Sequence, residues 1–106
     1  MSNFNDMLTK AKEMQQKMSE IQKKIKSMEV SGSSGGDLVQ VVISGDNEIK
    51  SITVKEEAKK EKEEFINDLI IAAYNNAREN LQKKSNEELS KLTGGISLPP
   101  GFKFPF

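Results

Sequence analysis

The chain has 106 residues, and its 16 lysine and arginine residues balance 16 aspartate and glutamate residues, so the formal net charge is zero. It has no cysteine, histidine or tryptophan, which excludes disulfides, zinc–thiolate sites and imidazole catalysis. The length suits one small domain, and no window approaches the roughly 18 apolar residues of a membrane span. The N-terminus lacks the apolar run of a secretory signal, so we expect a cytoplasmic protein.

Charge is unevenly distributed along the chain. Residues 3–28 carry six lysines against three acids, and residues 78–106 carry five basic residues against three acids. Between them, residues 37–68 carry nine acids against five lysines. A fold that brings the two basic ends together would create a positive surface on a neutral protein. The alternative is a solvated helix surface of mixed charge.

Residues 3–29 are expected to form a long helix. Apolar residues recur there at alternating steps of three and four, the heptad spacing of a coiled-coil seam. Such a helix would be about 40 Å long, so its seam needs either the second long helix or another chain as a partner. The stripe comprises Phe4, Met7, Ala11, Met14, Met18, Ile21, Ile25 and Met28.

Residues 30–54 are expected to form a small antiparallel sheet. Two β-branched runs, 38–44 and 49–54, flank a Gly/Asp/Asn turn, which is typical of a β-hairpin. Residues 28–31 would add a third short strand. Both faces of the hairpin are partly apolar, so we expect each to be covered, and a second copy of the chain would supply that cover.

Residues 60–84 are expected to form the second long helix, because apolar residues recur at helical spacing. Ser85 and Glu88 match a Ser-x-x-Glu capping box, which predicts a new helical turn at Ser85 and extends the helical segment over 60–93. The Pro/Phe tail, 94–106, is expected to pack on the body or on a partner chain. The prediction is therefore a single α+β domain over 1–106, with a long N-terminal helix, a small β-hairpin sheet and a long C-terminal helix.

No constellation of residues indicates catalysis. GSSGG at 32–36 lacks the Gly-Lys-Ser/Thr ending of a phosphate loop and is predicted to be a flexible turn. The carboxylates of 56–64 alternate with lysines at a helix start, where acids favour the positive end of the dipole. No serine or threonine has an imidazole to activate it. We therefore predict a protein that is not an enzyme, with no metal, cofactor, membrane or small-molecule substrate.

Lysines of the first helix fall into rows. Lys10, Lys17 and Lys24 form one row, and Lys12 and Lys26 belong to another. Rows of this kind can track phosphates, although lysines also commonly flank a coiled-coil seam. The chain has a single arginine and no base-stacking platform, so no readout of base edges is predicted.

Three blocks of sequence resemble the YbaB/EbfC family of bacterial nucleoid-associated proteins. They are GSSGGDLVQVVISGDNEIKSITV at 32–54, DLIIAAYNNA at 68–77 and TGGISLPPGFKFPF at 93–106. The Met-, Gln- and Lys-rich N-terminal helix also fits, so the resemblance covers nearly the whole chain in order. The sequence departs from the pattern at Asp37, where the family often has glycine, and over 55–64, which is unusually charged.

The resemblance implies a tweezers-like homodimer with helical arms that binds double-stranded DNA in the nucleoid. It implies a contribution to nucleoid organisation, with gene regulation as a further expectation. The family's DNA contacts are attributed to the arms. Carried over to this sequence, they fall on Lys10, Lys12, Lys17, Lys23, Lys24, Lys26, Arg78, Lys83, Lys84 and Lys91.

A second interpretation is a chaperone-like or scaffolding protein. Two long helices separated by a hairpin also build prefoldin-type subunits, whose apolar tips bind unfolded clients. The methionine-rich seam of the first helix would suit that role. Suppression of client aggregation without DNA affinity would favour this alternative.

Overall fold

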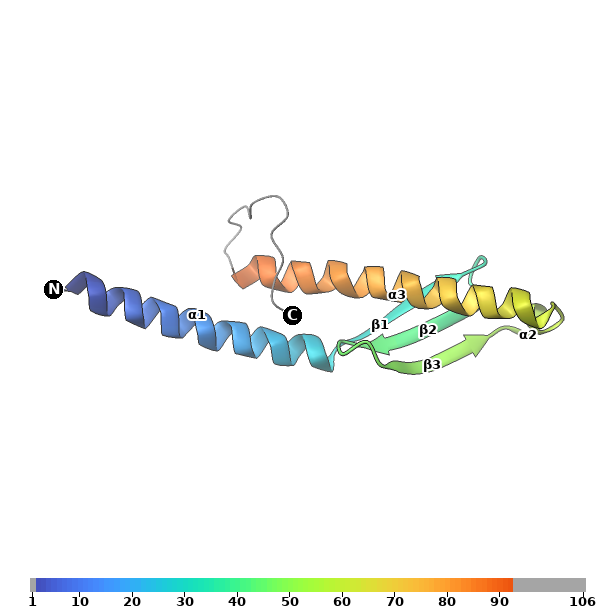
Figure 1. Cartoon of the computed structure of the whole chain (residues 1–106), viewed down its shortest axis with the longest axis horizontal. Helices are drawn as coiled ribbons and strands as arrows, with labels where there is room; N and C mark the ends of the chain where they lie inside the picture. Colours follow the sequence, from blue (N-terminus) through green and yellow to red (C-terminus); the bar gives the residue numbers. More distant parts are fainter. Residues whose placement is uncertain (1, 93–106) are drawn as a thin grey trace.

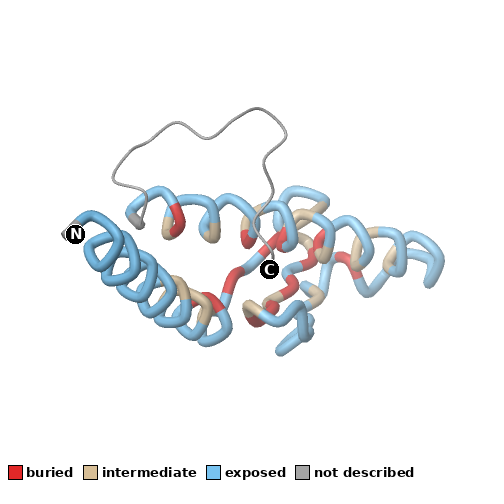
Figure 2. Tube along the Cα trace, turned by 60° about the vertical axis from the view of Figure 1, so that its left-hand side comes forward, coloured by how far each residue is buried: buried red, intermediate tan, exposed pale blue. Residues whose placement is uncertain are grey.

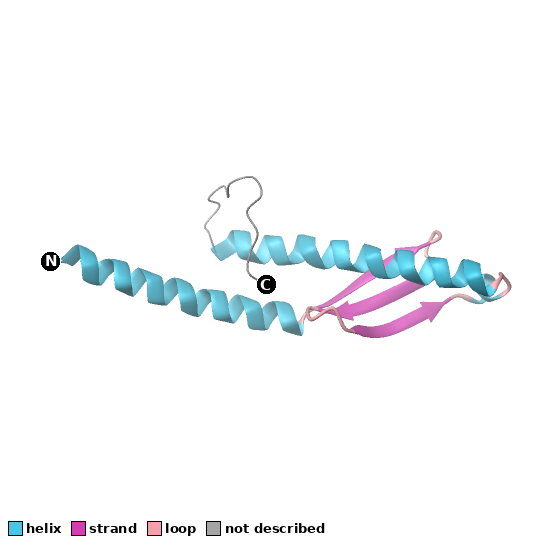
Figure 3. Ribbon diagram, viewed as in Figure 1, coloured by secondary structure: helices cyan, strands magenta, loops and turns pink. Residues whose placement is uncertain are grey.

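The computed structural model describes residues 2–92, which fold into two long helices joined through a three-stranded sheet (Figure 1). The molecule is elongated, at 72 × 26 × 17 Å, because α1 extends away from the sheet beside the C-terminal half of α3 (Figure 3). The elements are α1 (Ser2–Ser27), β1 (Glu29–Ser34), β2 (Val39–Ser44), β3 (Ile49–Val54), α2 (Glu56–Lys59) and α3 (Glu63–Leu92). The predicted α+β architecture is confirmed, and the tail from Thr93 onward lies outside the described residues.

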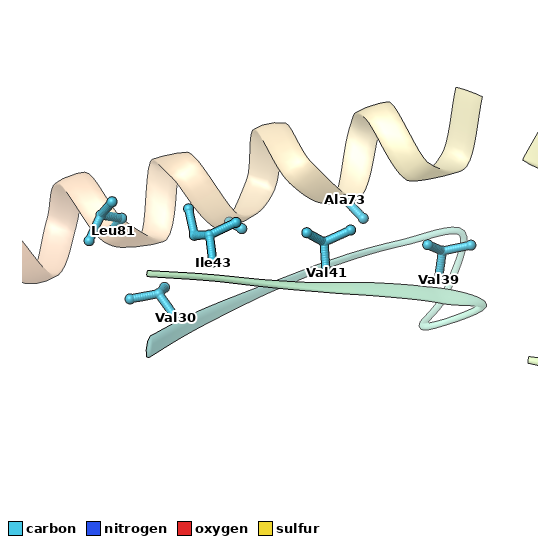
Figure 4. Close-up of a cluster of buried hydrophobic side chains, with 7 residues drawn as sticks. Val30, Val39, Val41, Ile43, Ala73 and Leu81 are labelled. Atoms are coloured by element: carbon cyan, nitrogen blue, oxygen red, sulfur yellow. The ribbon is translucent and has the colours of Figure 1, made fainter. Parts of the chain in front are cut away.

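The sheet is an antiparallel meander in the order β1-β2-β3, and α3 packs against β1 and β2. Alternate side chains of β2 point towards α3 and are fully buried: Val39, Val41 and Ile43. The facing side of α3 carries small residues, Ala73 (Figure 4) and Ala77, which let the helix approach closely. The opposite face of the sheet carries exposed Gln40, Ser51 and Thr53 beside half-buried Val42. No element within residues 2–92 covers this face, so the expected cover on both faces is not found within the described residues.

β1 continues through Gly32–Ser34, so the prediction of a turn over this whole segment is wrong. Gly32 pairs with Val41 in the antiparallel ladder. A Cβ atom at Gly32 would overlap the backbone of Ala73 and Ala77 in α3. The glycine therefore marks close packing of helix on strand, a tertiary constraint that a local Gly/Ser pattern does not reveal.

The β1–β2 turn begins one residue after Ser34. Gly35, Gly36 and Asp37 have φ angles of 62°, 64° and 70°, so three consecutive residues adopt the left-handed conformation. Glycine suits all three positions, and aspartate is among the few other residues that tolerate it. Asp37, the position at which the sequence departs from the pattern of the family it resembles, therefore occupies a conformation that aspartate can adopt.

α3 runs without a break from Glu63 to Leu92, so the predicted new helical turn at Ser85 is wrong. The Ser-x-x-Glu pattern lies inside the helix, where the backbone N–H groups already have helical partners and need no cap. The charged segment before α3 contains the four-residue helix α2, which the sequence analysis did not predict. Its one buried residue is Ala58.

Only part of the α1 apolar stripe is covered. Ile25 is buried and Ile21 is half-buried beside α3, whereas Phe4 and Met7 are 66% and 68% exposed. Every residue from 3 to 17 is exposed (Figure 2). α3 is therefore the predicted partner for the end of α1, and the first half of α1 projects as an uncovered arm. Within residues 2–92, neither long helix is apolar enough to cross a bilayer.

Candidate nucleic-acid interface

All ten basic residues that the sequence analysis assigned to DNA binding are exposed to solvent. Three of them, Lys10, Lys12 and Lys17, lie on the projecting part of α1. Successive residues of a helix turn by about 100°, so these lysines flank the apolar stripe on both of its sides. The projecting arm therefore presents positive charge around an apolar seam.

The two long helices bring Lys17, Lys24 and Lys91 together. These residues line a shallow groove of about 370 Å³ between α1 and α3, in which Ile21 forms an apolar patch. The groove also contains two acids, Glu20 and Glu88. The two basic segments therefore meet at this groove, which is lined by three cations and two anions.

Glu88 connects the two helices across this groove. Its Oε2 accepts a hydrogen bond from Lys24 Nζ at 2.9 Å, and its Oε1 accepts one from Lys91 Nζ at 3.1 Å. The bonds to Lys24 and then Lys91 hold the pKa of Glu88 below its ordinary value and outweigh the opposing effect of burial. Glu88 is thus ionised at neutral pH, and the sequence analysis, which treated it only as part of a cap, missed this role.

Lys26 and Arg78 lie in a second concavity. An open cleft of about 860 Å³ is formed where the end of α1, the β2–β3 turn and α3 meet. The Arg78 guanidinium lies 6.0 Å from the centroid of the Tyr74 ring, at the limit of a cation–π contact. Asp46 and Glu79 also line this cleft and offset its two cations.

Lys23, Lys83 and Lys84 are exposed and line neither concavity. The basic residues therefore form a dispersed surface along two helices rather than a pocket. Lysines act as point charges that suit backbone phosphates, whereas paired readout of bases is typically the work of arginine and amide side chains. Within residues 2–92, no three His, Cys, Asp or Glu side chains gather in a way that could hold a metal ion.

An α+β domain with exposed, lysine-bearing helices defines a small binding protein with basic arms. Residues 1–96 match the YbaB/EbfC DNA-binding family, and the chain belongs to that family. This membership confirms the resemblance found in the sequence.

Curated relatives and a solved structure agree with this assignment. The chain is 42% identical to a nucleoid-associated protein of Rickettsia felis and 41% identical to one of Rickettsia prowazekii, each over the whole of both chains. It is 39% identical to a nucleoid-associated protein of Bartonella bacilliformis over 100% of this chain and 99% of the relative. The crystal structure of an uncharacterized protein from Helicobacter pylori shares the fold, with a TM-score of 0.69 at 18% identity over 86% of this chain and 97% of that one.

Proposed function

We propose that this chain is a nucleoid-associated protein that binds double-stranded DNA through lysines of α1 and of the C-terminal half of α3. One observation carries the proposal. α1 holds six lysines against three acids, and all six lysines are exposed on a helix that projects from the sheet. The family and the names of its curated relatives support the same function, and we place the protein in the nucleoid.

The mechanism is electrostatic. Each lysine that neutralises a phosphate releases condensed counterions, so binding falls steeply as salt rises. The acidic residues lie mainly in the middle of the sequence, which leaves the arm basic although the whole chain is neutral. Contacts to phosphates position the protein on the duplex but do not depend on the base sequence. We therefore expect little base preference.

A second copy of the chain is the proposed partner. β3 exposes Ile49 and Ile52, and α3 exposes Phe65 and Ile71, although all four are large and apolar. The outer edge of β1 is occupied by asparagine side chains of α3, whereas β3 has no neighbour on its outer side within residues 2–92. A homodimer that covers these residues would remove an exposed apolar surface from water and place two arms on one particle.

The test is fluorescence anisotropy of the full chain with a labelled duplex of about 30 base pairs, over a salt series. The arm variant changes Lys10, Lys12 and Lys17 to glutamine. A matched control changes Lys55, Lys60 and Lys62, which adjoin α2, the element at the opposite end of the molecule from the start of α1 (Figure 1). We expect the arm variant to flatten the slope of log affinity against log salt by up to about 2.7, or 0.9 per lost contact, and the control to leave the slope unchanged.

Equal effects of the two variants would refute the arm as the DNA surface. Absence of DNA binding by the wild type would refute the function itself. Suppression of client aggregation would then favour the scaffolding alternative, because Phe4, Met7 and Met14 expose apolar surface along α1. We propose a binding protein rather than an enzyme in either case.

A further inference from the structure

Glu88 has both of its oxygens engaged by lysines that the proposed function assigns to DNA. One partner, Lys24, lies in α1, and the other, Lys91, lies one turn further along α3. The Glu88 side chain is only 13% exposed, whereas those of Lys24 and Lys91 are 57% and 69% exposed. The carboxylate thus lies in the groove while the two ammonium groups remain at its rim, within reach of solvent.

A lysine in this position can exchange its partner. An ion pair with an exposed member contributes little net stability, because solvent and salt screen the two charges. A DNA phosphate at the rim would offer each ammonium group an equivalent acceptor. However, Glu88 occupies one of the three N–H donors of each ammonium group and offsets its charge. A phosphate at the rim must therefore compete with Glu88 for the lysine or bind beside the Glu88 anion.

We propose that Glu88 is a positioning residue that attenuates DNA affinity by holding Lys24 and Lys91 away from the phosphates. The inference rests on the proposed function and goes beyond it, because it separates the basic residues into two classes. Lys10, Lys12 and Lys17 have no ion pair within residues 2–92 and are immediately available to DNA. Lys24 and Lys91 are paired with Glu88, which limits their contribution to DNA binding.

The closing experiment compares Glu88→Gln with Glu87→Gln in the full chain, using the same labelled duplex and salt series. Glu87 is the neighbouring exposed acid and has no ion pair among the described residues. Both variants remove one negative charge from the same turn, but only Glu88→Gln releases two lysines. We expect Glu88→Gln to bind roughly tenfold more tightly near 0.1 M salt and to steepen the salt slope by about one to two units. Glu87→Gln should change affinity by less than about twofold and leave the slope unchanged.

A double-mutant cycle distinguishes control of Lys24 by Glu88 from a purely structural role of Glu88. Lys24→Gln should weaken DNA binding little in the wild type, where Lys24 is held by Glu88, and several-fold more in the Glu88→Gln background. Equal losses in both backgrounds would overturn the proposal, as would a Glu88→Gln protein that binds no more tightly than Glu87→Gln. If the wild type binds no DNA, the proposed function fails first, and that result is visible without any variant.

Discussion

Gly32 in β1 lies directly against the backbone of Ala77 in α3, with no space for a side chain between them. This contact joins the edge strand to the helix that carries the C-terminal basic residues. The small side chains of Ala73 and Ala77 allow the same close approach from the helix side. The position of α3 relative to the sheet therefore depends on a glycine within a strand.

We predict that Gly32→Ala destabilises the protein by about 3 kcal/mol or more, because the overlapping atoms belong to the backbone and cannot rotate away. Gly36→Ala is the control. Its φ of 64° strains an alanine by about 1–2 kcal/mol, yet a Cβ there meets no atom within 4 Å. Denaturant unfolding should show the larger loss for Gly32→Ala, and comparable losses would contradict the close-packing argument.

Asparagine side chains of α3 cover the outer edge of β1. Asn76 Oδ1 accepts a hydrogen bond from the Ser33 backbone N–H at 3.0 Å, and Asn80 Nδ2 donates one to the Ser31 carbonyl at 2.9 Å. These bonds satisfy backbone groups that an edge strand otherwise leaves open to pairing with other chains. They also restrict strand addition to the β3 side of the sheet.

We predict that Asn76→Ala lowers the free energy of unfolding by about 1–3 kcal/mol, because the partly buried Ser33 N–H loses its acceptor. Asn76→Asp keeps an acceptor oxygen in the same place and should lose less. Hydrogen exchange of the Ser33 amide measures the bond directly. If that amide is equally protected in wild type and Asn76→Ala, the assignment of the bond is wrong.

The sequence predicted the elements whose signal is local. The heptad stripe placed α1, and alternation of β-branched residues placed β2 and β3 to within a residue. Gly32–Ser34 was mistaken for turn because its strand conformation is imposed by pairing with β2 and by contact with α3. The continuous course of α3 through Ser85 was missed because a capping pattern has the same spacing inside a helix as at its end.

The residues of the candidate site could be predicted from the sequence, but the contacts between them could not. Every lysine of the proposed interface is visible in the sequence, and its exposure follows from its place beside the apolar stripe. The pairing of Lys24 with Glu88 joins residues 64 positions apart. It depends on how α1 and α3 align, which no local pattern specifies.

Glu88 should make stability depend on pH. Lys24 and Lys91 lower its native pKa, so the folded state binds protons less readily than the unfolded state does. The stabilisation is fully present above the ordinary glutamate pKa of about 4.3 and is lost as pH falls through the lowered native value. We predict that Glu88→Gln is less stable than wild type at neutral pH and that the difference shrinks below about pH 4.

Unfolding by urea over a pH series measures this difference. Glu87→Gln is again the matched control, since it removes a carboxylate from the same turn without breaking an ion pair. A difference between wild type and Glu88→Gln that stays constant down to low pH would show that the ion pairs do not stabilise the fold.

β3 exposes apolar side chains on the face of the sheet that α3 covers elsewhere. Ile52 is 46% exposed although it pairs with the fully buried Val41 and points to the same face of the sheet. α3 covers that face over β1 and β2, so the β3 portion is left for the second copy. We predict that Ile52→Lys weakens self-association at least tenfold, because a charge would have to be desolvated in the dimer interface.

Ser51→Lys is the control, because Ser51 is exposed on the opposite face of the same strand. Sedimentation velocity over a concentration series should show wild type and Ser51→Lys as dimers at micromolar concentration and Ile52→Lys as a monomer. If all three proteins sediment alike as dimers, the interface lies elsewhere, and the projecting stripe of α1 becomes the surface to vary. If the wild type is itself a monomer, the two arms cannot act on one DNA segment together, and each chain binds with the salt slope of a single arm.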